Sequence, residues 1–397
     1  MLETRIAKEL AYISQAGLAR RITELYFVNP AQAQDRTGKT YLVLASNNYL
    51  GFTHAPEVIE AASRAALKFG TGSSGSRLTT GGTFIASELE KRLADFKHSE
   101  SALVFNTGYM TNLGILYGLL QTGDVVFSDE LNHASIIDGC RISRCKVVVY
   151  KHNDMADLQR LLETEIVTGQ RFIVTDGVFS MDGDIADLPS LAVLKKQFNA
   201  FLIVDDAHGV GVMGNDGSGT ASHYGLTDVI DLQVGTLSKA LAAEGGYVAG
   251  KKILIDYLIN RSRPFIFSTA LAPATLAAAN AALLLLQTQA SKYIDSLRAN
   301  SRLMRRLLLE GGLNVVEGIT PIIPVVIGEA GLTMQFADRL KSKGILVSGI
   351  RPPTVPRGES RLRITVTAAH CEEQLRQAAQ IITALWQELK HGEKKEG

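Results

Sequence analysis

The sequence predicts an α/β protein in which a wound, mostly parallel sheet forms the core of a large domain. Short apolar runs alternate with helical patterns from about residue 100 to 250, and a polar loop follows nearly every run. The chain has 397 residues, which is too long for one small core and favours a large domain with a smaller one beside it. We therefore predict an N-terminal helix and arm over residues 1–50, a large domain over 51–288 and a smaller α+β C-terminal domain over 289–397.

The N-terminal part of the chain predicts a helix, a loop and a strand. Apolar residues at helical spacing predict a helix over residues 2–24, with Arg20 near its end, and a loop follows over 30–38. A short strand then leads into the polar turn Ser46–Gly51, where asparagines usually satisfy backbone groups. Residues 70–82 are rich in Gly, Ser and Thr; this composition suits a flexible linker or a loop whose backbone amides approach an anion.

The strand pattern Ala102–Phe105 runs directly into Asn106–Asn112, which opens a helix. A strand followed by a glycine and a helix start brings unpaired backbone N–H groups and the positive end of the helix dipole to the mouth of a crevice. Gly108 is therefore a candidate phosphate site. A simple strand-to-helix turn is the alternative.

Two adjacent strand patterns predict the chemical centre of the sheet. The apolar run Phe201–Val204 ends in Asp205, and the run 229–234 is followed by Lys239. Because ligands bind beyond the carboxyl ends of parallel strands, both side chains face one crevice. Pyridoxal phosphate (PLP) needs a lysine amine to hold its aldehyde and a carboxylate to keep its pyridine nitrogen protonated, so this pair predicts a PLP site. The alternative is a core aspartate that caps a turn and an ordinary surface lysine.

Other polar residues follow strand patterns and converge on the same edge in this interpretation. His133 has a flat ring that suits stacking on a flat cofactor, although a lone histidine is more often structural. Residues 245–250 predict an edge strand that returns from the site. The residues expected to meet in one pocket are Gly108, His133, Ser180, Asp205, His208 and Lys239.

The C-terminal domain begins with a cationic helix from about residue 290 and continues with strand and helix patterns. Residues 351–356 predict a rigid, proline-rich turn. Arg361 and Arg363 alternate on one face of the following strand. An arginine on a strand can hold a carboxylate through two parallel hydrogen bonds, and half-solvated surface arginines are the commoner case.

Composition excludes several classes of function. The formal charge is +1 without a basic run outside the C-terminal tail, so nucleic-acid binding is not expected. Three cysteines form no Cys-x-x-Cys pair and suit a reducing compartment. The most apolar segment, residues 270–286, is too short and interrupted to span a bilayer, and we find no metal-ligand cluster. We expect a cytoplasmic protein without a membrane segment or metal.

Five motifs together carry a resemblance to a known family. The chain resembles the α-oxoamine synthases, PLP-dependent enzymes with the type I transferase fold of aspartate aminotransferase, and the resemblance covers nearly its whole length. The motifs are Ser46–Gly51, Leu131–Ser135, Asp176–Gly183, Asp205–Gly209 and Gly235–Lys239.

The resemblance implies a role for each matching residue around the PLP ring. Lys239 would bind the aldehyde and later remove the Cα proton of the amino acid, and Asp205 would pair with the pyridinium. His208 would bond the phenolic oxygen of the ring, with Ser180 beside it. His133 would stack on the ring and assist proton transfer.

The resemblance also implies phosphate and substrate contacts. Gly108, Tyr109 and Thr236 would hold the phosphate or its surroundings, and Thr269 would reach the phosphate of the neighbouring subunit in a homodimer with a shared active site. The substrate contacts would be Arg363 for the amino-acid carboxylate, Arg20 and Thr354 for the acyl group, and Asn47 and His133. Arg21 is the adjacent alternative to Arg20.

Within the family, the turn Arg351–Pro356 and the run Asp205–His208 favour the branch that condenses L-alanine with a pimeloyl thioester in biotin biosynthesis. The acyl carrier would be coenzyme A or an acyl carrier protein. Residues 261–273 also resemble the branch that uses glycine and acetyl-CoA, which is the alternative. A noncatalytic protein that retained the fold is a more distant alternative, and the presence of Lys239 with Asp205 speaks against it.

Overall fold

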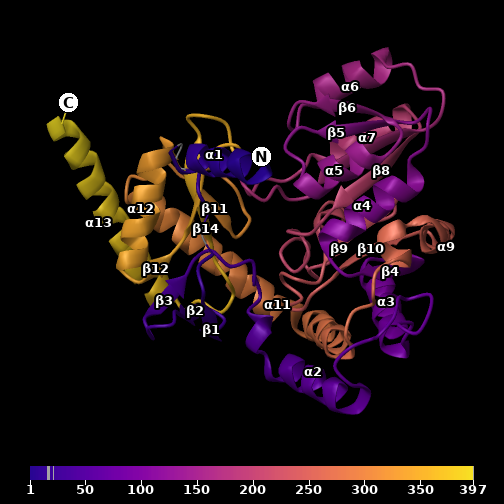
Figure 1. The fold of residues 1–397 in the computed structure, drawn as a ribbon, viewed down its shortest axis with the longest axis horizontal. Helices are drawn as coiled ribbons and strands as arrows, with labels where there is room; N and C mark the ends of the chain where they lie inside the picture. The colour runs from indigo at the N-terminus through magenta and orange to yellow at the C-terminus, as the bar shows by residue number, and fades with distance from the viewer. Residues whose placement is uncertain (16–17, 21, 397) are drawn as a thin grey trace.

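The computed structural model describes residues 1–15, 18–20 and 22–396, with side chains described up to residue 390 (Figure 1). Its largest sheet has seven strands in the order β4-β10-β9-β8-β7-β5-β6. Only β10 runs antiparallel to its neighbours, so the predicted mostly parallel sheet is confirmed. The strands are β4 (Ser101–Phe105), β5 (Val125–Asp129), β6 (Lys146–Tyr150), β7 (Arg171–Asp176), β8 (Ala200–Asp205), β9 (Leu232–Thr236) and β10 (Gly246–Gly250).

Helices cover both faces of this sheet. Successive strand residues point to opposite faces, so in β8 Ile203 packs in one core cluster while Leu202 and Val204 pack in another. The first cluster contains residues of α4 (Gly108–Leu119), α5 (Ala134–Ile142), α9 (Lys252–Arg261) and α10 (Arg263–Ile266). The second contains residues of α6 (Met155–Thr164), α7 (Leu188–Gln197) and the short α8 (Thr220–His223).

The strand predicted at the sheet edge lies inside the sheet. β10 pairs with β9 on one side and with β4 on the other, and β4 and β6 form the edges. The prediction was wrong because the sequence of a strand does not show whether it pairs on one side or on both sides. Here the strand that follows the site lies between two other strands. Since β10 runs antiparallel to both neighbours, β4 has the same direction as β9, and Gly108 follows β4 at the edge where β8 and β9 end.

A third, mixed cluster contains residues of the large sheet and of the C-terminal lobe. The long helix α11 (Pro273–Glu310) connects the two lobes and carries a kink at Gln289. It packs on α2 (Pro56–Phe69) and α3 (Phe84–Phe96) at one end and on α13 (Glu372–Glu396) at the other. The other C-terminal elements are β11 (Ile322–Gly328), α12 (Ala330–Ser342), β12 (Ile345–Leu346), β13 (Ser348–Ile350) and β14 (Ser360–Thr365).

The N-terminal segment differs from the prediction. The helix α1 (Leu2–Gln15) ends before Arg20. Strand β1 (Tyr26–Asn29) precedes the loop predicted over residues 30–38, and strand β2 (Gln32–Gln34) lies within it. Gly17, a weak helix former, follows the last helical residues in the sequence. A third strand, β3 (Thr40–Val43), pairs with β12 of the C-terminal lobe, and the helical turn η1 (Phe52–His54) follows it.

The division into residues 1–50, 51–288 and 289–397 stays a prediction. Its second boundary falls inside α11, directly before the kink at Gln289. Among the described residues, no helix combines the length and the apolar character needed to cross a membrane.

Candidate active site

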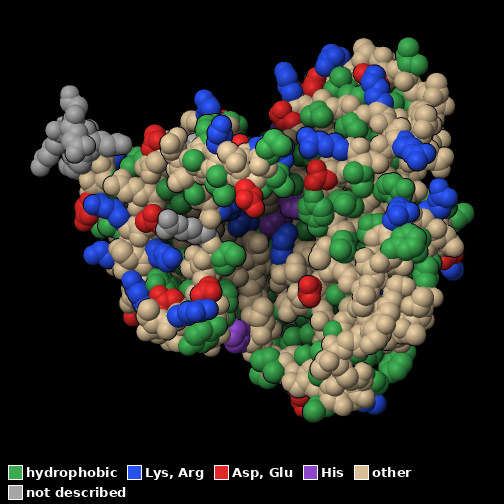
Figure 2. Space-filling view, in the orientation of Figure 1, with side chains coloured by type: hydrophobic (Ala, Val, Ile, Leu, Met, Phe, Trp, Pro, Cys, Tyr) green, Lys and Arg blue, Asp and Glu red, His purple; other side chains and the backbone are tan. Residues whose placement is uncertain are grey.

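Asp205 and Lys239 stand at the ends of adjacent parallel strands. Asp205 is the last residue of β8, and Lys239 lies three positions beyond Thr236, the last residue of β9. Burial lowers the pKa of Lys239 to about 8, against the attraction of Asp205 and Asp176. The lysine amine therefore lies within electrostatic range of the Asp205 carboxylate. Figure 2 shows histidine and cationic side chains deep in the hollow between the two lobes.

Asp205 is buried and held by two donors. The Nδ2 of Asn112 donates to it at 2.5 Å, and the backbone N–H of Ala207 donates at 3.0 Å. Asn112 also donates to Ser135 at 2.9 Å. The sequence analysis missed Asn112, although its place four residues after Gly108 on one helix face could have revealed it.

Asp176, at the end of β7, is the register partner of Asp205. Burial and the charge of Asp205 hold the pKa of Asp176 well above its usual range, which favours its neutral form. It accepts a hydrogen bond from the backbone N–H of His133 at 2.9 Å. Asp176 thus positions the start of α5 through the backbone of His133.

The two predicted histidines are both oriented by neighbouring hydroxyl groups. His133 Nδ1 lies 2.7 Å from Ser135 Oγ, and burial lowers the pKa of His133. His208 Nδ1 lies 2.6 Å from the hydroxyl of buried Tyr49. Burial holds the pKa of His208 well below its usual range, so this ring is neutral and Nε2 is the nitrogen left for a ligand.

Gly108 forms the first turn of α4, which Thr107 caps by accepting from the N–H of Met110 at 3.0 Å. The N–H groups of such a first turn have no partner within the helix. A Cβ on Gly108 would lie 3.4 Å from Thr236, and one on Gly246 would lie 2.6 Å from Gly108 N. The turn therefore fits closely against the end of β9, as a phosphate site at this edge requires.

Tyr109 and Thr269 flank this turn. The Tyr109 hydroxyl donates to Asp138, a hydrogen bond that raises the pKa of Tyr109, and its ring meets His133 edge-on with centroids 6.3 Å apart. Thr269 is exposed, and its carbonyl accepts from Asn106 at 2.7 Å. Both predicted residues thus lie beside the first turn of α4.

Arg363 brings the C-terminal lobe to the site. Its guanidinium donates to the carbonyl of Ser180, to Thr365 at 3.0 Å and to Asn47 Oδ1 at 3.2 Å. Three predicted residues from distant parts of the sequence, Asn47, Ser180 and Arg363, therefore meet. Arg361, on the same strand, pairs with Asp182 and Glu359 instead.

Arg20 and Thr354 line a common groove of about 750 Å³. A neighbouring hollow of about 310 Å³ shares Met181 and Thr354 with it and reaches Ser180. The predicted acyl residues are thus connected to the site through the loop after β7. Arg21, the alternative to Arg20, lies outside the described residues.

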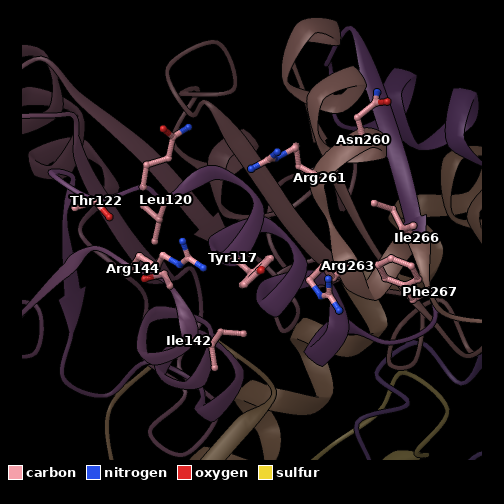
Figure 3. A pocket seen from close by; sticks show the side chains of 12 residues that line it. Tyr117, Leu120, Thr122, Ile142, Arg144, Asn260, Arg261, Arg263, Ile266 and Phe267 are labelled. Atoms are coloured by element: carbon pink, nitrogen blue, oxygen red, sulfur yellow. The ribbon is translucent and has the colours of Figure 1, made fainter.

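A separate hollow of about 570 Å³ lies at the far end of α4 (Figure 3). Tyr117, Arg144, Arg261 and Arg263 line it. Tyr117 lies nine positions after Gly108 on the helix, a distance of about 13.5 Å along the axis. None of the predicted site residues lines this hollow, and no group of three metal-ligating side chains occurs anywhere in the described part of the chain.

Comparison with known proteins gives the family. The model of the family described as aminotransferase class I and II matches residues 39–382. The chain belongs to this family.

Two relatives share nearly half of their residues with this chain. The 8-amino-7-oxononanoate synthase of Lysinibacillus sphaericus is 47% identical over 374 residues, which cover 94% of this chain and 96% of that protein. The protein of the same name from Trichlorobacter lovleyi is 49% identical over 385 residues, covering 97% and 98%.

Solved structures agree with this placement. The serine palmitoyltransferase of S. paucimobilis with a bound PLP-myriocin aldimine has a TM-score of 0.91 and 31% identity over 97% of both chains. The 8-amino-7-oxononanoate synthase of Francisella tularensis has a TM-score of 0.75 and 30% identity over 89% of this chain and 98% of that one. The predicted type I PLP-dependent transferase fold and the resemblance to the α-oxoamine synthases are confirmed.

Proposed function

We propose that this protein catalyses the decarboxylative condensation of L-alanine with a pimeloyl thioester. The products are 8-amino-7-oxononanoate, carbon dioxide and a free thiol, and the reaction belongs to biotin biosynthesis. The observation that carries the proposal is the pair Asp205 and Lys239 on adjacent strand ends, in a chain 47% identical to a named 8-amino-7-oxononanoate synthase.

The residues at the strand ends fit PLP. The first turn of α4 at Gly108 offers backbone N–H groups to a phosphate, with Thr236 alongside. Asp205 would hold the ring nitrogen, His208 Nε2 the phenolic oxygen and Lys239 the aldehyde. When bound, PLP supplies an electron sink for the carbanion at Cα of the amino acid.

Lys239 is suited to move the Cα proton of L-alanine. With a pKa of about 8, its amine is partly neutral near pH 7 and can act as a base. His133, whose pKa is lowered, lies close enough to feel the charges of Asp205 and Lys239 and would cover the ring and assist the transfer. Tyr49 would keep His208 oriented through the 2.6 Å contact.

Arg363 would anchor the carboxylate of L-alanine. Three of its five N–H groups donate to Ser180, Thr365 and Asn47. One unused N–H group therefore remains on each of the two terminal nitrogens. Two such parallel donors suit a carboxylate. Asn47 and Ser180 would set the angle at which that carboxylate is held.

We further propose a cytoplasmic homodimer in which Thr269 of each subunit reaches the phosphate in the other. The exposed position of Thr269 supports this assembly. The acyl donor is a thioester of coenzyme A or of an acyl carrier protein. The alternative substrates, glycine and acetyl-CoA, receive no support from the names of the relatives described above.

The test is a side-by-side assay of the purified, PLP-loaded protein. L-alanine with pimeloyl-CoA should release free thiol and yield 8-amino-7-oxononanoate, detected by mass spectrometry, much faster than glycine with acetyl-CoA releases thiol. Faster turnover of glycine with acetyl-CoA would establish the alternative. A protein that takes up no PLP and releases no thiol would be the noncatalytic case.

A further inference from the structure

The groove that contains Arg20 and Thr354 has apolar walls and a cationic end. Its apolar lining includes Leu10, Ile13, Leu18, Met181 and Ile350. Its two charged residues are Arg20 and Arg351, and none of the described residues that line it is acidic. Such a lining suits an apolar chain that ends in an anion.

Arg351 is half-buried at this cationic end and has no charged partner among the described residues. Its Nη2 donates to the carbonyl of Ala19 at 3.2 Å, and its Nη1 lies 2.8 Å from the sulfur of Met334. Within the described residues it forms no ion pair, and three of its five N–H groups stay available. A partly buried cation without a carboxylate is costly unless a ligand supplies the negative charge.

The strand register fixes how far Arg351 lies from the amino-acid end of the site. In the pairing of β13 with β14, Ser348 lies opposite Arg363, and Arg351 follows three residues later. Three residues of extended chain span about 10 Å. The seven-carbon pimeloyl chain has six carbon-carbon bonds of about 1.5 Å, which span roughly 7.5 Å in an extended zigzag. The length of the acyl chain is therefore of the same order as the backbone interval between these two positions.

We propose that Arg351 binds the terminal carboxylate of a dicarboxylic acyl chain and thereby selects pimeloyl thioesters over fatty acyl thioesters of equal length. This inference rests on the proposed function and names the residue that sets its acyl specificity. The acyl chain lies along the apolar wall between Met181 and Ile350, and its thioester points towards Ser180 through the shared hollow.

The experiment compares pimeloyl-CoA with heptanoyl-CoA, which has the same chain length but no terminal carboxylate. Each is assayed with L-alanine and the PLP-loaded wild type, and each is titrated without L-alanine by calorimetry, where no turnover occurs. The matched variants are Arg351→Gln and Arg357→Gln, which lose the same charge; Arg357 is exposed and does not line the groove. The wild type should prefer pimeloyl-CoA by roughly tenfold to hundredfold, as a charge-assisted pair provides.

Arg351→Gln should reduce this preference to about one, through KM and through the dissociation constant, while Arg357→Gln should keep it. An unchanged preference in Arg351→Gln would overturn the proposal, as would an equal loss in Arg357→Gln, which would indicate a general charge effect. If the wild type turns over neither thioester, the proposed function fails. The calorimetric preference then decides separately whether Arg351 recognises the carboxylate.

Discussion

The two sides of the candidate site are built in different ways. On the sheet side, Asp205 and Lys239 stand at the ends of paired strands, and their neighbours hold them at short range. On the C-terminal side, Arg363 and Arg361 reach across to the loop after β7, at Ser180 and Asp182. The register of the sheet therefore fixes the positions of the groups on the sheet side. The positions of the groups on the C-terminal side depend on how the loop after β7 is held.

This difference separates chemistry from substrate selection. Substitutions on the sheet side should abolish the reaction and leave substrate binding in the groove unchanged. Changes on the C-terminal side should weaken substrate binding and leave the sheet-side groups intact. Each experiment below tests that separation, beginning with the largest expected effect.

Lys239→Ala should lower the rate of thiol release by about 10³-fold or more, because it removes the amine that moves the Cα proton. The variant should still fold, since the Lys239 side chain forms no hydrogen bond or ion pair with the described residues, and its backbone carbonyl still accepts from Ala242 N–H. Circular dichroism and PLP absorbance after gel filtration check both points. Lys196→Ala, which removes an exposed lysine on α7, is the control. Turnover within tenfold of the wild type would refute the role of Lys239.

Asp205→Asn should mainly lower the catalytic rate, and Asp206→Asn should mainly lower the stability, although the two residues are adjacent. The first should lower kcat by about 10²-fold or more, because the ring nitrogen loses its anionic partner, with little loss of stability. The second should unfold more easily by about 3 to 5 kcal/mol, because buried Lys97, 3.2 Å from Asp206, is left unpaired. Kinetic assays and urea unfolding of both variants give the comparison. Equal kinetic and stability profiles would contradict it.

Arg363→Gln should raise KM for L-alanine by roughly tenfold to hundredfold, because it removes the two donors available to the carboxylate. PLP absorbance and PLP affinity should stay those of the wild type, since Arg363 belongs to the other side of the site. Arg306→Gln, on the exposed face of α11, is the control. A loss of PLP with unchanged KM would show that the two sides are not separable.

The sheet side could be predicted from sequence because its positions follow from local patterns. Apolar runs that end in Asp205 or lead to Lys239 mark strand ends, and parallel strand ends meet at one edge. Gly108, His133 and His208 follow the same rule. Asn112 was missed because its partner Asp205 is 93 residues away, and its place one helical turn after Gly108 indicates a shared face but not that partner.

The contacts on the C-terminal side of the site were harder to predict from the sequence, also because they join residues that are far apart along the chain. Tyr49 lies in a motif that the sequence analysis quoted, yet its contact with His208 depends on how the N-terminal arm packs. The contacts of Arg363 with Ser180 and Asn47 join three distant segments. β10 was predicted at the edge of the sheet but lies between β4 and β9, because the order in which strands pair is set by the tertiary fold and not by local sequence. Local patterns predict elements and strand ends, while long-range side-chain partners require the fold.

The smallest effect concerns His152, which anchors the loop on which the C-terminal side depends. Its Nδ1 lies 3.0 Å from Asp129 and its Nε2 lies 2.8 Å from Asp184, at the end of that loop. Burial lowers the pKa of His152, but the hydrogen bonds to the two carboxylates outweigh it and raise the pKa to about 10. The imidazolium is therefore the form that holds the loop.

The stability from this raised pKa is fully present below about pH 6.5, the ordinary histidine value, and is lost as the pH rises towards 10. Urea unfolding at pH 6.5 and 9.5 should show a loss of about 1 to 3 kcal/mol in the wild type that is absent in His152→Gln. His98→Gln, which removes an exposed histidine, should keep the wild-type dependence. At pH 9.5, KM for L-alanine should rise before PLP is released, because the loop carries Ser180 and Asp182 to the arginines of the C-terminal side. Release of PLP without a change in KM would place His152 on the sheet side instead.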